Sequence, residues 1–270
     1  MKKAFSWVWL CLILALTYIP ILILAAYSFT DATMVGGNVT GASFDNYINL
    51  FKNEELRSMI IGTVLLALGS ALISTILGTL GAIGGHYSRR TAKTVLHTAN
   101  EIPVVNADVV TGFSLCVLLI ILLGIKKDTY VPLVIGHVVL SAPFVYLSIL
   151  PKSKQLDNNL YEAALDLGAT PAQALFKVVL PQLIPGILSG FMLAVTLSLD
   201  DYFVTTYTKP STFDTISTYV VNATKGSQTE IKTALWALST VIFLIVVTIV
   251  VLMNVLSAKR KEKNKNEKIA

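Results

Sequence analysis

The sequence predicts an all-α integral membrane protein with about six transmembrane helices, and composition and patterning both point to this class. Apolar residues make up 54% of the 270 residues and charged residues 14%, with a mean hydropathy of +0.69. A soluble domain carries roughly 25% charged residues, so this chain has too few charges to cover a soluble surface. Its apolar residues gather in runs of roughly 20, the length that an α-helix needs to cross a bilayer. Strands of an outer-membrane barrel would instead alternate over roughly 10 residues.

Six charge-poor runs are expected to span the membrane. They cover residues 8–29, 59–85, 102–124, 130–150, 183–207 and 233–257. The first run is longer than the roughly 7–15 apolar residues of a cleaved signal peptide and is followed by no clean A-x-A cleavage site, which predicts a retained helix. A turn and a short surface helix are expected between the first two runs. No low-complexity linker separates a second domain, so residues 1–270 are expected to form a single membrane domain.

The placement of lysine and arginine predicts that both termini face the cytoplasm. With the N-terminus inside, the inner segments 1–7, 86–101, 151–182 and 258–270 hold 14 of the 21 basic residues, and the outer segments hold the other 7. Cytoplasmic segments of membrane proteins carry such an excess. Six of the basic residues lie in the tail 258–270, where we expect them to anchor at anionic lipid headgroups and not to bind nucleic acid.

The long inner segment 151–182 carries signals for two short helices separated by a sharp turn. Asp157 or Asn158 can cap the first helix, and Gly168 can end it in the left-handed conformation. Thr170 and Gln173 have the spacing of a capping box, with a proline at the first helical position between them. The first helix, about nine residues long, would measure roughly 14 Å.

This segment also resembles the EAA motif of ABC importer permeases. The resemblance rests on Glu162-Ala163-Ala164, on Gly168 six residues after the glutamate, and on a Leu-Pro pair twelve residues after the glycine. In that family the segment is the coupling helix, which docks in a groove of a cytoplasmic ATPase. The resemblance therefore implies that Glu162, Ala163, Ala164 and Gly168 contact that ATPase, and it implies the fold of a type I ABC importer permease.

A closer resemblance, over nearly the whole chain, is to spermidine/putrescine permeases of the PotC type. It rests on the Ser198-x-Asp200-Asp201 stretch, on residues 103–115 around Asp108, and on a Tyr-Ile-Pro sequence at residues 18–20. This chain departs from the family pattern at residues 106–108, where it has Asn-Ala-Asp in place of Ser-Pro-Asp and so lacks a helix-shaping proline.

The resemblance implies a permease subunit of an ATP-driven polyamine importer in the bacterial inner membrane, working by alternating access. The implied partners are a cytoplasmic ABC ATPase in two copies, a second homologous permease subunit and an extracytoplasmic substrate-binding protein. The chain has no P-loop sequence, so ATP and Mg²⁺ would be used by the partner ATPase and no cofactor is expected in this chain. We expect no enzymatic activity of its own.

Three carboxylates inside apolar runs, Asp108, Asp200 and Asp201, are the candidate substrate-pathway residues. An ionised aspartate at the bilayer centre costs on the order of 2.5–3.5 kcal/mol, so such residues usually face a cavity or a partner. On one continuous helix, Asp200 and Asp201 would point about 100° apart, so one could face the pathway while the other meets a neighbouring helix.

Aromatic residues flank this pair and complete the candidate pathway set: Tyr202, Phe203 and Tyr207. On a continuous helix, Phe203 and Tyr207 would lie one and two turns beyond Asp200, on roughly its face. Carboxylates bind ammonium groups, and aromatic faces bind both ammonium and methylene groups, so this set suits a polyamine.

Structural roles compete with these assignments. Each aspartate could bond to Ser or Thr on an adjacent helix or to a partner subunit, and a packing role is expected for His137. Cys11 and Cys116 are interpreted as small apolar residues. Other classes also remain: a related importer for iron, thiamine, an opine or sulfate, an ion-coupled secondary transporter, or a membrane enzyme. An anion importer should place Arg or Lys within its spans, and these runs hold none.

Overall fold

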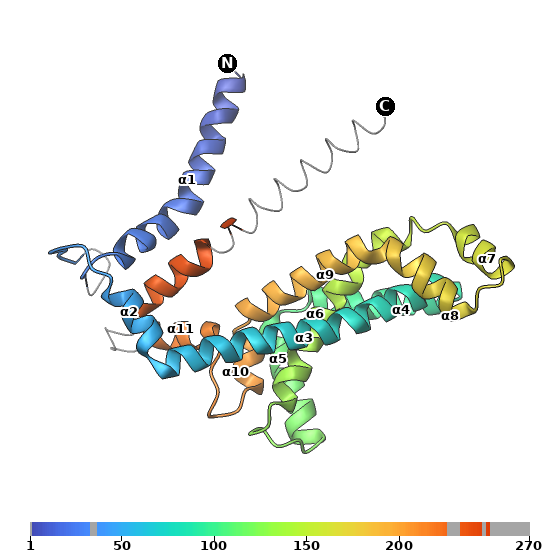
Figure 1. Ribbon diagram of the computed structural model, residues 1–270. Helices are drawn as coiled ribbons and strands as arrows, with labels where there is room; N and C mark the ends of the chain where they lie inside the picture. Colours follow the sequence, from blue (N-terminus) through green and yellow to red (C-terminus); the bar gives the residue numbers. More distant parts are fainter. Residues whose placement is uncertain (1, 33–36, 226–232, 245–246, 249–270) are drawn as a thin grey trace. The chain divides into compact units, whose positions relative to one another are not determined.

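The computed structural model describes residues 2–32, 37–225, 233–244 and 247–248, and these residues are almost entirely helical (Figure 1). Four of the described helical runs are long and apolar enough to cross a membrane, and a bent pair of helices makes a fifth. The all-α membrane class is therefore confirmed. The sixth expected span, 233–257, is described only in part, as the apolar helix Thr233–Leu244, and its remainder lies largely outside the described residues.

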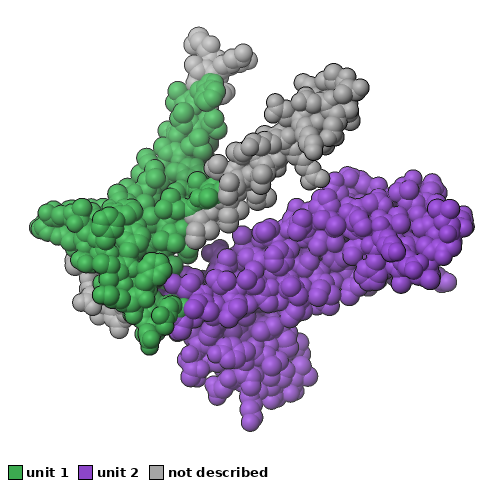
Figure 2. Space-filling view, viewed as in Figure 1, with its two compact units in different colours: residues 1–57, 220–270 green, residues 58–219 purple. Residues whose placement is uncertain are grey.

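The named elements are all helical. In chain order they are α1 (Lys2–Ser28), α2 (Asp45–Lys52), α3 (Glu54–Tyr87), α4 (Arg90–Val105), α5 (Asp108–Cys116), a π-helical turn η1 (Val117–Leu122), α6 (Val131–Ser153), α7 (Asn158–Asp166), α8 (Pro171–Ala174), a second π-helical turn η2 (Leu175–Val179), α9 (Leu180–Asp200), α10 (Phe203–Thr208) and α11 (Ile216–Lys225). The chain forms two compact units, residues 1–57 with 220–270, and residues 58–219 (Figure 2).

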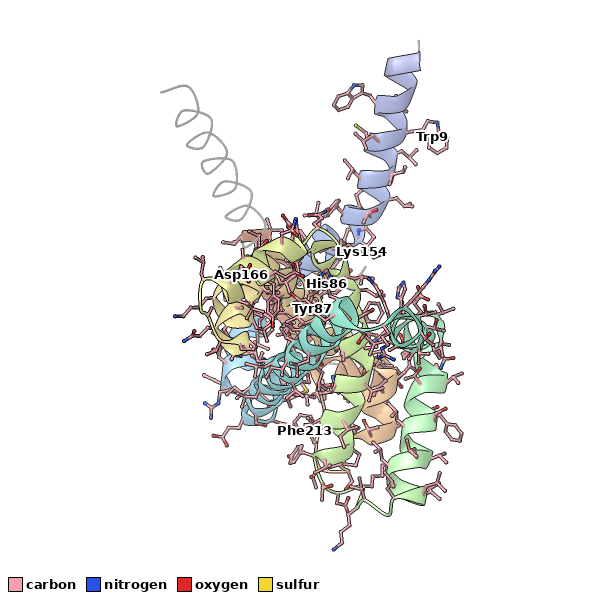
Figure 3. All side chains as sticks on the ribbon, turned by 90° about the vertical axis from the view of Figure 1, so that its right-hand side faces the viewer. Trp9, His86, Tyr87, Lys154, Asp166 and Phe213 are labelled. Carbon is pink, nitrogen blue, oxygen red and sulfur yellow. The ribbon has the colours of Figure 1, made fainter. Side chains whose placement is uncertain are left out.

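In the first unit, a small polar cluster joins the end of α1 to α2 and to the helix Thr233–Leu244. The Ser28 hydroxyl lies 2.8 Å from the Tyr47 hydroxyl and accepts a hydrogen bond of 3.2 Å from Thr240. Asn46 donates to the carbonyls of Ser28 and Thr30, at 3.1 Å each. The apolar side chains of α1 are exposed along its length, and Figure 3 shows Trp9 projecting outward from it, as expected of a lipid-facing helix.

In the second unit, α6 is the central helix and packs against α4, α5, α9 and α10. Val145 of α6 lies where glycines of two other helices allow a close approach. A Cβ added at Gly78 of α3 would lie 2.8 Å from the Val145 Cβ, and one added at Gly190 of α9 would lie 3.2 Å from its Cα. Gly190 also forms a G-x-x-x-G pair with Gly186. In lipid there is no hydrophobic driving force that brings helices together. Membrane helices associate instead by close van der Waals packing, which small residues at the contact allow.

Two expected straight spans are interrupted, which corrects the prediction of unbroken runs at 102–124 and 183–207. α4 and the following helical run meet at an angle of 106°. Asn106 and Ala107 are extended there, and the Asn106 side chain donates to the Thr111 hydroxyl at 3.0 Å. This chain therefore bends here without the proline. The second interruption lies directly after Asp200.

Replacing Gly78 by alanine should destabilise the helix packing. The added methyl group would overlap Val145 and the Tyr146 backbone, whose nitrogen lies 2.9 Å away, and such overpacking costs about 1–3 kcal/mol. Gly69 on the same helix is the matched control, because nothing lies within 4 Å of an added Cβ, and alanine there gains about 1 kcal/mol in helix propensity. Thermal unfolding of the purified chain in detergent should move in opposite directions for the two variants. Equal shifts would contradict the close α3–α6 contact.

Candidate functional site

The helix interruption at Asp201 forms the centre of the candidate substrate site. Asp201 is extended, between the last residue of α9 and the first turn of α10. Its side chain is buried and accepts hydrogen bonds from the backbone N–H groups of Val204 (3.2 Å) and Thr205 (2.7 Å) and from the Thr205 hydroxyl (2.7 Å). The carboxylate thus satisfies the free N–H groups at the start of α10, as a helix-capping residue does.

A buried polar network extends from this cap to α3 and α6. His137 Nε2 lies 3.0 Å from the Thr205 hydroxyl and 3.8 Å from the Asp201 carboxylate. Its Nδ1 lies 2.7 Å from the Ser198 hydroxyl, which is 3.2 Å from the Ser70 hydroxyl. All five residues are buried. Four helices and the cap residue between two of them therefore share one polar network within the apolar part of the chain.

The short helix α10 is held between α5 and α6. A Cβ added at Gly112 of α5 would lie 3.0 Å from the Val204 Cα, and one added at Gly136 of α6 would lie 2.7 Å from the Val204 side chain. Val204 is fully buried as a result. The ring of Phe113 on α5 packs edge-on against Tyr207 of α10, with 5.9 Å between ring centroids, so the predicted pathway residue Tyr207 contacts α5.

The two adjacent aspartates have different surroundings. Asp200 is exposed and ends α9, whereas Asp201 is buried and begins the cap of α10. The expectation that Phe203 and Tyr207 continue the face of Asp200 along one helix is wrong, because the backbone is extended at Asp201. Tyr202 and Phe203 instead pack edge-on against each other at 5.2 Å, with Phe203 41% exposed.

Asp108 lies at the first position of α5, directly after the 106° bend, and is exposed. It therefore lies at a helix N-terminus, whereas the sequence predicted one unbroken span over residues 102–124 around it. The structure connects Phe113 and Gly112 of the same helix to α10, but no described contact joins Asp108 to either of the paired aspartates. The described residues contain no group of three His, Cys, Asp or Glu side chains that could hold a metal ion.

The sequence does not identify Ser70 or Thr205 as members of the network, and it predicts only a packing role for His137. Ser198 belongs to the Ser-x-Asp-Asp stretch. One signal could have pointed to the network, since a histidine within an apolar run needs polar partners. Its partners lie 61 and 68 residues away in the sequence, so pairing them requires the fold.

The inner segment folds as expected from its local signals. Asp157 accepts from the Asn159 N–H and so caps α7, while Thr170 and Gln173 form both bonds of a capping box on α8. Gly168 has a φ of +86°, and its N–H donates to the Leu165 carbonyl at 2.8 Å. With a second bond from the Ala169 N–H to the Ala164 carbonyl, these contacts make a Schellman motif.

The surface of this turn combines acidic and apolar side chains. Glu162, Ala163 and Gly168 are exposed, and Ala164 is partly buried. Leu167 is 89% exposed and Phe176 is 64% exposed. Figure 3 looks onto this end of the unit, with Asp166 and Tyr87 labelled. Tyr161 packs on the ring of Tyr87 at 5.3 Å and so holds α7 to the end of α3.

Comparison with known proteins agrees with this architecture. Residues 78–263 match the family described as "Binding-protein-dependent transport system inner membrane component". The spermidine/putrescine transport system permease protein PotC of Haemophilus influenzae is 30% identical over 96% of this chain and 97% of its own length. The putrescine transport system permease protein PotI of Escherichia coli K12 is 33% identical over 70% of this chain and 69% of its own length.

Solved structures share the fold. A chain of a bacterial ABC transporter involved in the import of the acidic polysaccharide alginate matches with a TM-score of 0.70 at 18% identity, covering 93% of this chain and 95% of that chain. The same kind of transporter in complex with an alginate pentasaccharide-bound periplasmic protein also gives 0.70, at 20% identity over 92% of each chain. With most of its length matched by the family and by relatives, the chain belongs to the inner membrane components of binding-protein-dependent transport systems.

Proposed function

We propose that this chain is a permease subunit of an ATP-driven importer of polyamines such as spermidine and putrescine. The observation that carries the proposal is the similarity to spermidine/putrescine permeases over nearly the full length of both chains. Fold similarity does not separate substrates within the family, since the alginate transporter has the same fold and its substrate is acidic.

The chemistry of the candidate site supports a cationic substrate. Asp200 presents an exposed carboxylate, and Tyr202 and Phe203, which follow it closely in the sequence, have partly exposed rings. A polyamine alternates ammonium groups with methylenes, which suit carboxylates and aromatic faces respectively. Asp108 adds a second exposed carboxylate at the start of α5. An anion importer would be expected to place an Arg or Lys within its spans, and the runs 59–85, 102–124, 130–150 and 183–207 contain neither.

Coupling to ATP would run through the turn between α7 and α8. Two copies of a cytoplasmic ABC ATPase, which use ATP and Mg²⁺, would dock on Glu162, Ala163, Ala164 and Gly168. This requires the N-terminus, the tail 258–270 and the turn to face the cytoplasm, as the basic residues predict. A second homologous permease subunit would complete the pathway, and an extracytoplasmic binding protein would deliver the substrate. Alternating access would follow as the ATPases close and reopen.

Uptake of labelled spermidine into proteoliposomes that hold this chain with its partner subunits tests the substrate. The proposal predicts ATP-dependent uptake that putrescine reduces and that sulfate and thiamine leave unchanged. An Asp200→Asn variant should raise the apparent KM about tenfold, because it removes one charge-assisted hydrogen bond to an ammonium group. ATP hydrolysis that drives no polyamine uptake would contradict the polyamine assignment, and unchanged kinetics in Asp200→Asn would contradict its pathway role.

A Gly168→Asp substitution tests the coupling turn. It places a side chain in the left-handed conformation and adds charge to the proposed docking surface, so ATPase association should weaken about tenfold or more. Gly124→Asp is the matched control, because Gly124 also has a positive φ, of 65°, but lies in the connection expected on the outer face. Co-purification of the ATPase with each variant measures the difference. Equal ATPase recovery with both variants would contradict the assignment of the turn.

A further inference from the structure

His137 is the one buried side chain of the network that contacts both α9 and α10, which flank the interrupted backbone. It comes from α6, and its two ring nitrogens reach Ser198 on α9 and Thr205 on α10. His137 Nε2 lies 3.8 Å from the Asp201 carboxylate, and the side chains of His137 and Asp201 are 0% and 3% exposed. Nothing in the proposed transport cycle so far uses this histidine.

The donor and acceptor capacities of Asp201, Thr205 and His137 indicate which atom donates in each contact. The Thr205 hydroxyl lies 2.7 Å from an Asp201 carboxylate oxygen and 3.2 Å from the Asp201 backbone carbonyl. An ionised carboxylate only accepts, so the single hydroxyl hydrogen is assigned to the shorter, charge-assisted contact. With that assignment the Thr205 oxygen is an acceptor toward the ring, 3.0 Å away, and the tautomer that fits is the one with a hydrogen on His137 Nε2. This holds whether or not Nδ1 is protonated, because the Ser198 hydroxyl can donate to Nδ1 or accept from it.

We propose that His137 is a positioning residue for the Asp201 carboxylate. By donating from Nε2 to Thr205, it turns the threonine hydroxyl onto Asp201 and so stabilises the capped start of α10. The consequence for transport rests on the proposed function. The interrupted backbone places Asp200 on the exposed side while Asp201 is buried in the cap, so Asp200 contacts the polyamine and Asp201 does not.

The interruption gives two adjacent carboxylates different hydrogen-bond partners. Asp201 uses both of its oxygens on N–H and O–H donors of α10. The side-chain oxygens of Asp200 have no hydrogen bond or ion pair within the described part of the chain, whereas its backbone carbonyl accepts from Ser217. An ammonium group would therefore find more free acceptor capacity at the exposed Asp200 than at the buried Asp201, whose oxygens already accept three hydrogen bonds.

Three substitutions at His137 distinguish positioning from simple filling of space. A glutamine can place its amide N–H near the Nε2 position, an asparagine reaches only the Nδ1 side, and a leucine removes both contacts. His97→Gln is the matched control, since His97 lies on α4, partly exposed, and pairs with Glu101 at 3.5 Å. All variants would be made in the full transporter assembled in lipid.

Amide hydrogen exchange at Val204 and Thr205 reports the cap directly. His137→Leu and His137→Asn should speed exchange at these two amides about tenfold, because the cap opens more often, while exchange elsewhere in α6 and α9 stays within about twofold. His137→Gln should restore slow exchange, and His97→Gln should match the wild type. Should the leucine variant fail to assemble, the asparagine and glutamine pair still decides the result.

Kinetics of labelled spermidine uptake give the second measurement. His137→Asn should raise the apparent KM about fivefold or more with ATP hydrolysis retained, and His137→Gln should return KM toward the wild-type value. Equal exchange in the asparagine and glutamine variants would overturn the positioning role. If the wild type took up no spermidine, the proposed substrate would fail, and the exchange comparison would still test His137 independently.

Discussion

The need to satisfy polar backbone within an apolar region is the constraint on which this structure depends. Helices cross membranes because every backbone N–H and C=O then has a partner, and an interruption frees several of those groups at once. The chain interrupts a helix after Asp200 and satisfies the freed N–H groups with the Asp201 carboxylate. That carboxylate is in turn satisfied by Thr205, and Thr205 by His137. This series of donors and acceptors satisfies N–H groups that the interruption frees at the start of α10.

The packing around the interruption follows from the same constraint. A short helix such as α10 cannot cross a membrane alone, so its backbone must be enclosed by protein. Gly112 and Gly136 allow α5 and α6 to approach Val204 closely enough to enclose it. At the other end of the same unit, the helical run Pro171–Asp200 is continuous over 30 residues, which is about 45 Å. A single helical run therefore connects the turn after Gly168 to Asp200.

Features set by local chemistry could be predicted from the sequence. The apolar runs identified the spans, and Asp157, Thr170, Gln173 and Gly168 identified the helix ends of the inner turn, because each acts within a few residues of itself. The two interruptions were not predicted, because each lies within a run of residues long and apolar enough to cross a membrane as one helix. At the first, Asn106 bonds to Thr111 and replaces the shaping function of a proline. At the second, Asp201 caps local N–H groups of α10, but His137, which bonds to Thr205, lies on α6 and far away in the sequence, so only the fold shows which of the two aspartates is buried.

The central claim is that a polyamine is bound by Asp200 at an interruption whose cap is Asp201. A cryo-electron microscopy structure of the assembled transporter with bound spermidine tests it most directly. The account predicts an ammonium group at roughly 2.7–2.9 Å from the Asp200 carboxylate, with Asp201 still bonded to Val204 and Thr205. A substrate ammonium held by Asp201 in place of Thr205, or a continuous helix through residues 200–203, would contradict it.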